Sequence, residues 1–342
     1  SGVMEYYRPI ALTDAARPGD AFPLAGGWCW FDRVEILSRS APPRLVPASS
    51  LPEGVLHRLT AERPDFGNLS LDRPRLMGIV NVTPDSFSDG GRYLSQARAV
   101  EHGRLVARSA EMVDIGGEST RPGAAEVPVA EEIARTVPVI EALRAGGMRA
   151  PISIDTRKAM VAAAALAAGA TVVNDVSGLD FDPALGPLVA RTQAPLVLMH
   201  AQGLPETMQD DPQYADVLLD VYDALAERLA RAEAMGIDRA RIAIDPGIVF
   251  GKTMAHNLAL LRGLSLFHGL GCAILLGTSR KRFIGSIGRA ETAEDRMPGS
   301  VAVALSGIAQ GVQITRVHDV TETRQALRLW QALNTDHLEG QA

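Results

Sequence analysis

Cysteine and long apolar runs are both scarce in this sequence. Its 342 residues include only Cys29 and Cys272, which lie far apart and form no zinc-binding pattern. So low a cysteine content is typical of a reducing cytoplasm. No apolar run approaches the roughly 18 residues of a membrane-spanning helix, and the first residues lack the pattern of a signal peptide. We therefore expect a cytoplasmic protein without a membrane partner.

An excess of basic residues is also lacking. The chain has 40 aspartates and glutamates against 34 lysines and arginines, which gives a formal net charge of −6. A surface of this sign does not attract nucleic acid or anionic lipid, so neither is expected as a partner. Basic groups that bind a ligand must then be gathered locally.

The composition changes near residue 73. Before it, proline, arginine and aromatic residues are scattered without a clear period, whereas from Arg75 short aliphatic runs alternate with stretches of helical period. We therefore divide the chain into an N-terminal extension, 1–72, to which we assign no activity, a regular segment, 73–336, and a short tail, 337–342. The length fits one barrel with an appendage.

Eight apolar runs in the regular segment predict β-strands, with helical stretches between them. The runs are 76–82, 111–117, 151–156, 171–177, 195–200, 241–247, 273–279 and 312–319. Eight such units in a row predict an α/β fold, a (β/α)₈ TIM barrel with an N-terminal extension. An open doubly wound sheet is the alternative, but it usually has fewer strands, and the fingerprint G-x-G-x-x-G is missing after the first run.

Polar residues end nearly every predicted strand. In a (β/α)₈ barrel the carboxyl ends of the strands meet at one mouth, where active sites lie. The sequence therefore predicts a ligand site there, built from Asn81, Asp114, Asp155, Asn174, His200, Asp245, Thr278 or Ser279, and Arg316 or His318.

Three of these residues, together with Lys281, predict the ligand's chemistry. Buried carboxylates such as Asp155 and Asp245 are costly unless hydrogen-bond donors match them. A 2-amino-4-oxo pyrimidine edge presents parallel N–H groups, much as a guanidinium does. Asn174 could donate and accept beside them, and Lys281 could meet the carbonyl. A structural polar network remains the alternative for any single residue.

The rest of the mouth has an anion-binding character. The stretch "GESTRPGA" (117–124) contains Arg121 and "TSRKRFIG" (278–285) contains Lys281, while "TRVHDV" contributes Arg316 and His318. A diphosphate would need a divalent cation, and the side-chain oxygen of Asn81 suits Mg²⁺, which takes few protein ligands. Taken singly, Arg280 and Arg282 are as compatible with an exposed surface position as with a role in binding an anion.

Long motifs in order make the chain similar to the dihydropteroate synthases over about residues 75–333. They include "GIVNVTPDSFSDGG", "DIGGESTRPGA", "VVNDVSG", "IDPGIVFGK", "LLGTSRKRFIG" and "TRVHDV". The resemblance implies a transferase of folate biosynthesis, the target of sulfonamides. It would condense 6-hydroxymethyl-7,8-dihydropterin diphosphate with 4-aminobenzoate and release 7,8-dihydropteroate and diphosphate. It also implies small-molecule substrates, Mg²⁺ as cofactor and a homodimer.

The resemblance implies a role for each matching residue. Asn81 would bind Mg²⁺, and the catalytic residues would be Asp155, Lys281, Arg316 and His318. The pterin would contact Asp155, Asn174, Met199, Asp245, Phe250 and Lys281. The diphosphate would face Thr120, Arg316 and His318, and 4-aminobenzoate would face Thr120, Arg121, Pro122, Ser279 and Lys281. Two positions depart from the family pattern, with Val249 where glycine is usual and Ala201 where methionine is common.

The expected reaction is an S_N1-like loss of diphosphate, since the dihydropterin ring can delocalise the cation. The loops after the first two strands, rich in Gly, Pro and Ser, are expected to order over Mg²⁺-diphosphate. Two rivals remain. A pterin-binding methyltransferase barrel would share the pterin residues but not the anion site, and a catalytically silent pterin-binding protein would be expected to have lost some of them.

Overall fold

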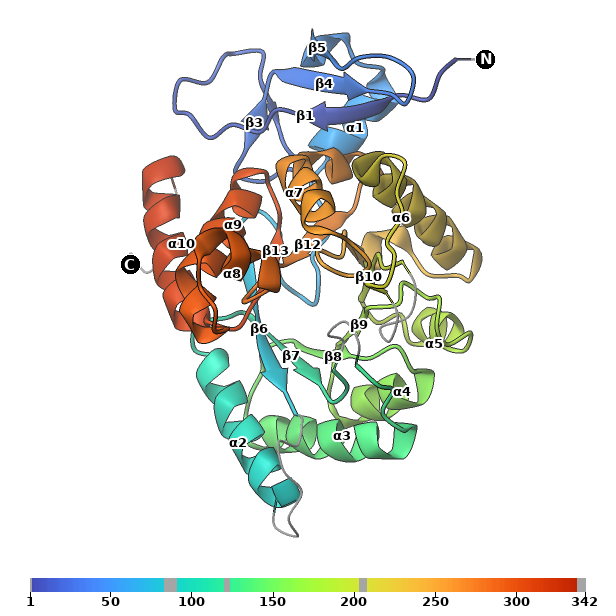
Figure 1. The fold of residues 1–342 in the computed structure, drawn as a ribbon, viewed down its shortest axis with the longest axis vertical. Helices are drawn as coiled ribbons and strands as arrows, with labels where there is room; N and C mark the ends of the chain where they lie inside the picture. Colours follow the sequence, from blue (N-terminus) through green and yellow to red (C-terminus); the bar gives the residue numbers. More distant parts are fainter. Residues whose placement is uncertain (1, 83–90, 120–123, 203–207, 337–342) are drawn as a thin grey trace.

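The computed structural model describes residues 2–82, 91–119, 124–202 and 208–336. The tail 337–342 and parts of the first two mouth loops lie outside this range, so the predictions made for Thr120, Arg121 and Pro122 do too. Figure 1 shows a barrel of strands surrounded by helices, with the N-terminal segment gathered at one side of it.

Eight parallel strands form a closed barrel, which confirms the predicted TIM fold. Each predicted run matches one strand, and β6 begins one residue before its run. In chain order they are β6 (Arg75–Asn81), β7 (Met112–Gly116), β8 (Ile152–Asp155), β9 (Val172–Asp175), β10 (Leu196–Met199), β11 (Ile242–Asp245), β12 (Ala273–Gly277) and β13 (Ile314–Val317). The last strand pairs with the first, with Arg316 opposite Met77, and this pairing closes the barrel.

Helices follow the strands and cover the barrel from outside (Figure 1). The main helices of the described barrel are α2 (Gly91–Val106), α3 (Val129–Ala145), α4 (Ala159–Ala168), α5 (Leu185–Thr192), α6 (Val217–Ala234), α7 (Met254–Arg262), α8 (Arg282–Gly288), α9 (Met297–Ala309) and α10 (Val320–Asn334). Short 3₁₀ helices are η2 (Arg239–Arg241), η3 (Leu264–Leu270) and η4 (Glu294–Arg296). Helix α4 ends before Gly169, whose φ of 124° favours glycine.

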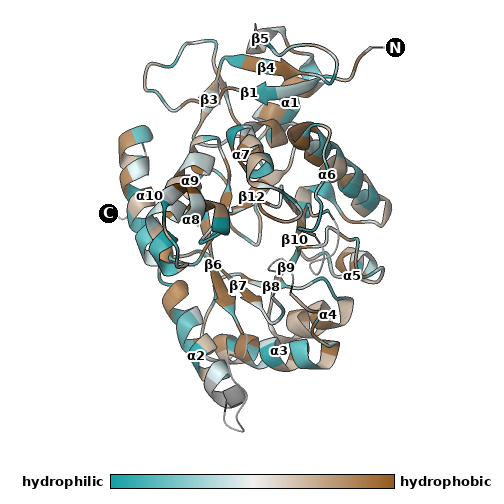
Figure 2. Ribbon diagram, viewed as in Figure 1, coloured by the Kyte–Doolittle hydropathy of each residue, from teal (hydrophilic) through white to brown (hydrophobic). Residues whose placement is uncertain are grey.

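The strands divide their side chains between two cores. Odd-numbered residues of β6 and even-numbered residues of β7 point inward, and Met77 and Met112 meet inside the barrel. Their neighbours, such as Val80 and Val113, point outward into the layer under the helices. Apolar colour accordingly dominates β6 and β7 in Figure 2, whereas α3 and α10 carry both colours.

The extension has a small core of its own. Strands β1 (Tyr6–Pro9), β4 (Arg33–Leu37) and β5 (Arg44–Pro47) form one antiparallel sheet, and β2 (Phe22–Pro23) pairs with β3 (Trp30–Phe31). A 3₁₀ turn, η1 (Ala48–Ser50), and helix α1 (Glu53–Thr60) complete the extension. Phe31, Val34 and Leu59 are fully buried within it.

The extension contacts the barrel at two kinds of place. On the outside, Trp28 donates its indole N–H to the carbonyl of Ile308, 2.8 Å away, in α9. The last part of the extension makes the second kind of contact. Phe66 and Leu71 pack with Met77 and Met112 inside the barrel, where they close its N-terminal end. Apolar side chains that fill this end remove it from water.

Candidate active site

The barrel mouth collects polar side chains that share the inward-facing positions of their strands. On β7 Asp114 follows Met112 by two residues, and on β9 Asn174 follows Val172 in the same way. The same alternation places Asp155 on β8 and Asp245 on β11 inward, with Met199 beside them on β10. The predicted pterin residues of the strands are thus brought together.

Arg316 joins two of the carboxylates across the mouth. Its Nε donates to Oδ2 of Asp114 at 2.7 Å, and its Nη2 donates to Oδ2 of Asp155 at 3.3 Å. Burial opposes the charge of the guanidinium, but Asp114 and Asp155 outweigh it and raise the pKa of Arg316. Asp114 was predicted only as a polar strand end, and the structure gives it the shortest bond to this arginine.

Three acceptor oxygens at the mouth lack a partner in the described part of the chain. They are Oδ1 of Asp114, Oδ1 of Asp155 and Oδ1 of Asn174, all buried. Burial raises the pKa of Asp155 well above its ordinary value, and the neighbouring Asp114 raises it further. Buried acceptors without donors are costly. The mouth is therefore prepared for a ligand that carries N–H groups.

The loop after β11 forms the next wall of the site. Oδ1 of Asp245 accepts a hydrogen bond from the backbone N–H of Gly247, at 2.8 Å. The ammonium of Lys281 donates to the carbonyl of Ile248 at 2.6 Å and lies 4.6 Å from the centre of the Phe250 ring. Burial lowers the pKa of Lys281 to about 7, against the attraction of Asp245. Asp245, Phe250 and Lys281, which the resemblance assigns to the pterin, thus lie close together.

Val249 lies in this loop with a φ of 83°. A β-branched residue rarely adopts this left-handed region, which explains why glycine is usual here in the family. Its backbone N–H donates to Oδ1 of Asn257 at 2.7 Å, and this bond helps to hold the loop. The departure from the family pattern thus stores local strain next to Phe250.

His200 does not belong to the ring, which corrects the sequence prediction. It follows Leu198, which points outward, so its side chain falls beneath the loop after β11. There its Nδ1 lies 2.9 Å from Nζ of Lys252. Lys252 is fully buried and also donates to the carbonyls of Gly247 and Phe250, at 2.8 and 2.9 Å. Sequence reasoning gave Lys252 no role.

Ser279 and His318 lie together on the opposite side of the mouth. The hydroxyl of Ser279 is 2.9 Å from Nδ1 of His318 and accepts its backbone N–H at 3.0 Å. Arg280 instead forms an ion pair with Asp319, at 2.7 Å. This pairing favours a surface position for Arg280 over a contact with a bound anion. Ser279 and His318 are therefore placed for an anion beside Arg316.

Asn81 stands at the carboxyl end of β6 and is exposed. Its position continues the inward-facing series of Met77 and Ile79, and no residue of the described chain binds its side chain. One free amide oxygen suits Mg²⁺, which keeps most of its waters or takes phosphate oxygens. Within the described ranges no cluster of three or more acidic, histidine or cysteine side chains offers a fuller metal site.

A buried ion-pair network supports the second mouth loop. Glu118 accepts from Nε of Arg157 at 3.1 Å and from Nζ of Lys158 at 2.8 Å, and Lys158 also binds Glu132 at 2.7 Å. Glu118 further accepts the backbone N–H of Val127. These bonds anchor both sides of the segment 120–123, which lies outside the described residues.

Lysine is used only near this mouth. The chain contains three lysines, Lys158, Lys252 and Lys281, and all its other strongly basic side chains are arginines. Lys158 and Lys252 are buried, and Lys281 is partly buried. A compact ammonium shifts its pKa readily when it is buried, unlike a guanidinium.

Comparisons with known proteins show which family the chain belongs to. A family described as pterin binding enzyme matches residues 77–318. Dihydropteroate synthase of Escherichia coli K12 is 45% identical over 266 residues, which cover 78% of this chain and 93% of that protein. The Bacillus subtilis enzyme of the same name is 43% identical over 263 residues, 77% of this chain and 89% of its own.

Solved structures give the same result. Xanthomonas albilineans dihydropteroate synthase with 4-aminobenzoic acid is 49% identical, with a TM-score of 0.73, and covers 79% of this chain and 97% of its own. The same enzyme in complex with 7,8-dihydropteroate is 47% identical, with a TM-score of 0.70, and covers 78% of this chain and 95% of its own. The Yersinia pestis enzyme with a sulfonamide drug complex is 44% identical, with a TM-score of 0.73, and covers 78% of this chain and 96% of its own.

Proposed function

This chain belongs to the pterin-binding enzyme family, among the dihydropteroate synthases, and from that premise we propose how its residues perform the reaction. It is a transferase that condenses 6-hydroxymethyl-7,8-dihydropterin diphosphate with 4-aminobenzoate to give 7,8-dihydropteroate and diphosphate. In the part of the chain that the structure describes, no helix is long and apolar enough to cross a membrane.

The observation that carries the proposal is the set of unpartnered acceptors at the mouth. The 2-amino group and ring N–H of a pterin would satisfy Asp245 and the free oxygens of Asp155 and Asn174. Lys281 would exchange the carbonyl of Ile248 for the pterin carbonyl, while Phe250 and Met199 pack near the ring. The buried oxygens of Asp155 and Asn174 then have partners.

We assign the diphosphate to Arg316 and His318, with Thr120 as a further partner from outside the described residues. The bond between the pterin methylene carbon and the diphosphate oxygen breaks, and its electron pair leaves with the diphosphate. Arg316 stabilises the negative charge that develops there. Asp114 and Asp155, which bind Arg316, offset the positive charge that the ring acquires.

The 4-aminobenzoate would lie between Ser279 and Lys281, with Arg121 and Pro122 completing its site. Its amine nitrogen attacks the methylene carbon and then loses a proton to water. Because the substrate amine is itself the nucleophile, no covalent bond to the enzyme forms. Ser279 is held by His318, which gives this side of the site a fixed position.

We further propose that Asn81 binds Mg²⁺ together with diphosphate oxygens and water. A bound Mg²⁺ would neutralise charge on the leaving group. The support is the unbonded side chain of Asn81 at the inward end of β6. EDTA should then abolish turnover while leaving the binding of a pterin without phosphates unchanged, and turnover that persists in metal-free buffer would reject the assignment.

The pterin assignment is tested by substitution at Asp245. Asp245→Ala leaves the pyrimidine donors unpaired, and loss of a charged partner costs roughly 2–3 kcal/mol, or about 100-fold in affinity. Calorimetry with a pterin lacking phosphates isolates this contact. Asp20→Ala, an exposed position on the extension, is the matched control. Wild-type affinity in Asp245→Ala would exclude the proposed orientation.

We also propose that the enzyme is a cytoplasmic homodimer. Two buried, unpaired cysteines support a reducing compartment, and the family resemblance supports the dimer. Sedimentation equilibrium of the purified chain tests the dimer, and a monomer mass at micromolar concentration would reject it.

A further inference from the structure

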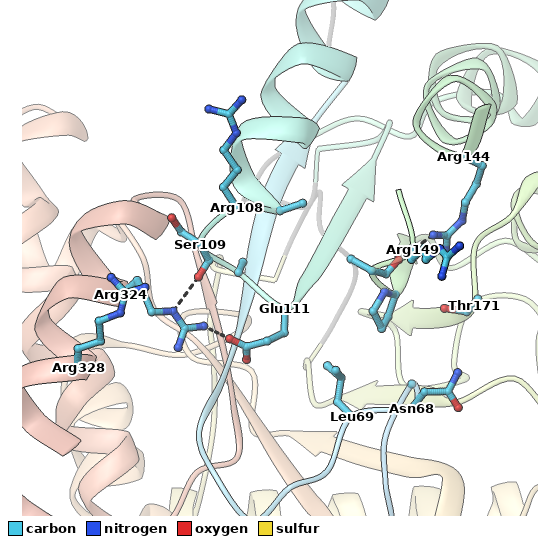
Figure 3. A pocket seen from close by; sticks show the side chains of 15 residues that line it. Asn68, Leu69, Arg108, Ser109, Glu111, Arg144, Arg149, Thr171, Arg324 and Arg328 are labelled. Atoms are coloured by element: carbon cyan, nitrogen blue, oxygen red, sulfur yellow. Dashed lines mark hydrogen bonds and ion pairs between the residues drawn. The ribbon is translucent and has the colours of Figure 1, made fainter. Parts of the chain in front are cut away.

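A pocket of about 630 Å³ lies at the end of the barrel opposite the mouth. Its lower wall is the turn 67–69 of the extension, and its sides come from the segment between α2 and β7, the segment between α3 and β8, and helix α10 (Figure 3). Pockets that bind small molecules have volumes of roughly 300–1,000 Å³. None of the residues assigned above to the reaction lines it.

Arginine dominates the charge of this pocket. Five arginines line it against a single carboxylate, Glu111; the five are Arg108, Arg144, Arg149, Arg324 and Arg328. One oxygen of Glu111 forms an ion pair with Arg324, and the other accepts the backbone N–H of Leu76 at 3.1 Å. Both oxygens of Glu111 are thus engaged within the protein. In a chain of net charge −6, this is a local concentration of positive charge.

Arg144 is the most informative of the five. Its Nε donates to the carbonyl of Gly169 at 2.9 Å, and its Nη1 donates to the carbonyls of Met148 and Ala150 at 2.9 and 2.8 Å. These bonds fix the guanidinium without neutralising it, and no carboxylate of the described chain forms an ion pair with it. Burial accordingly lowers the pKa of Arg144. A partly buried cation without a counter-charge favours an anion beside it.

Two exposed arginines stand at the rim. Arg108 and Arg149 form no ion pair with any residue of the described chain. Figure 3 shows Arg144 and Arg149 on one side of the pocket and Arg324 and Arg328 on the other, with Leu69 and Asn68 below the space between them. Leu69, Ala110 and Pro151 add apolar surface to the lining.

We propose that this pocket binds a small polyphosphate, with its anionic groups bridging the two sides and any organic part resting on Leu69 and Pro151. Guanidinium forks match phosphate oxygens in a bidentate manner, and a chain of phosphates is long enough to meet both groups of arginines. Because the pocket lies opposite the mouth, its ligand is an effector and not a substrate. The inference stands on this pocket alone and does not depend on the proposed reaction.

The test is calorimetric titration of the whole protein with ATP and with inorganic triphosphate, at about 0.15 M salt, where exposed charges are largely screened beyond roughly 8 Å. The double variant Arg108→Gln/Arg149→Gln removes two exposed charges and should fold normally, which its melting temperature without ligand checks. We expect its affinity for either probe to fall by 10-fold or more. If ATP binds more tightly than triphosphate, the ligand is an organic polyphosphate. If the two bind equally, it is an inorganic one.

Two further variants separate this pocket from the mouth and from general charge. Arg17→Gln/Arg191→Gln removes the same charge at exposed positions elsewhere and should bind both probes as the wild type does. Arg316→Gln removes the guanidinium of the mouth and should also retain binding. Unchanged affinity in Arg108→Gln/Arg149→Gln, or loss of binding in Arg316→Gln alone, would overturn the proposal.

Discussion

The Nζ atom of Lys252 lies 2.9 Å from Nδ1 of His200, and this contact joins the loop after β11 to the end of β10. Both side chains are buried, and burial lowers the pKa of each well below its ordinary value. A neutral amine has two N–H donors and one lone pair. It can therefore donate to the carbonyls of Gly247 and Phe250 and accept the ring N–H of His200.

Lys252→Met tests whether this contact positions the pterin wall. The change leaves three buried polar groups without their partner, so the free energy of unfolding should fall by about 2–4 kcal/mol, as measured by urea denaturation. We also expect weaker binding of a pterin to the folded fraction, since Phe250 and the carbonyl of Ile248 lose their support. If Lys252→Met lowers the stability but leaves the pterin affinity unchanged, Lys252 has a structural role only.

Asp114→Asn should impair the chemical step. It preserves the shape of the side chain but removes the charge that holds Nε of Arg316. A hydrogen bond to a charged group contributes roughly 1.5–3 kcal/mol, so turnover should fall by about 10- to 100-fold. Steady-state kinetics of Asp114→Asn and of Asp20→Asn, an exposed control, provide the comparison. Equal rates in the two variants would remove Asp114 from the site.

The pH dependence of substrate binding should report Lys281. Its lowered pKa of about 7 means that the amine is charged below this pH and neutral above it. Because the charged form donates a stronger hydrogen bond to the pterin carbonyl, the affinity for pterin diphosphate should decline as the pH rises above about 7. Lys281→Arg stays charged throughout and should lack this decline, while titration of the substrate itself is common to both proteins. The same decline in both would refute the assignment to Lys281.

Phe66→Ala should destabilise the barrel without affecting the mouth. Phe66 is buried at the N-terminal end among Met77, Met112 and Val197. Truncation of a buried phenylalanine costs about 3–5 kcal/mol through lost contacts and the remaining cavity. Leu45→Ala, at an exposed position of the extension, should cost almost nothing. Denaturant unfolding measures both, and a cost for Phe66→Ala below that of Leu45→Ala would show that the end needs no such closure.

The barrel and the pterin residues were predictable because both depend on short-range patterns. A strand such as β8 appears in the sequence as a run of aliphatic residues, and its last inward position, Asp155, follows directly from the alternation of side chains. His200 departs from this pattern. It lies two residues after Leu198, whose side chain points outward, so the alternation places His200 outside the ring even though it is a polar residue at a strand end.

Contacts between distant residues could not be predicted in this way. Asp114 and Arg316 are 202 positions apart and meet only because β13 pairs with β6. The network of Glu118 with Arg157 and Lys158 likewise needs two loops in their final places. The extension has no regular spacing of apolar residues from which its structure could be predicted. The position of Phe66 inside the barrel depends on the shape of the barrel's end, which no local sequence pattern describes.

The restriction of lysine to the mouth has a consequence for covalent inhibition. Amine-directed compounds usually react at many surface lysines, but here the surface offers guanidinium groups, which do not form imines under mild conditions. Lys281, with a pKa of about 7, carries a substantial fraction of neutral, nucleophilic amine at physiological pH. An aldehyde placed on a pterin analogue would condense with it and release water. Apart from the amino terminus, the only other amines in the chain, Lys158 and Lys252, are buried in hydrogen-bond networks.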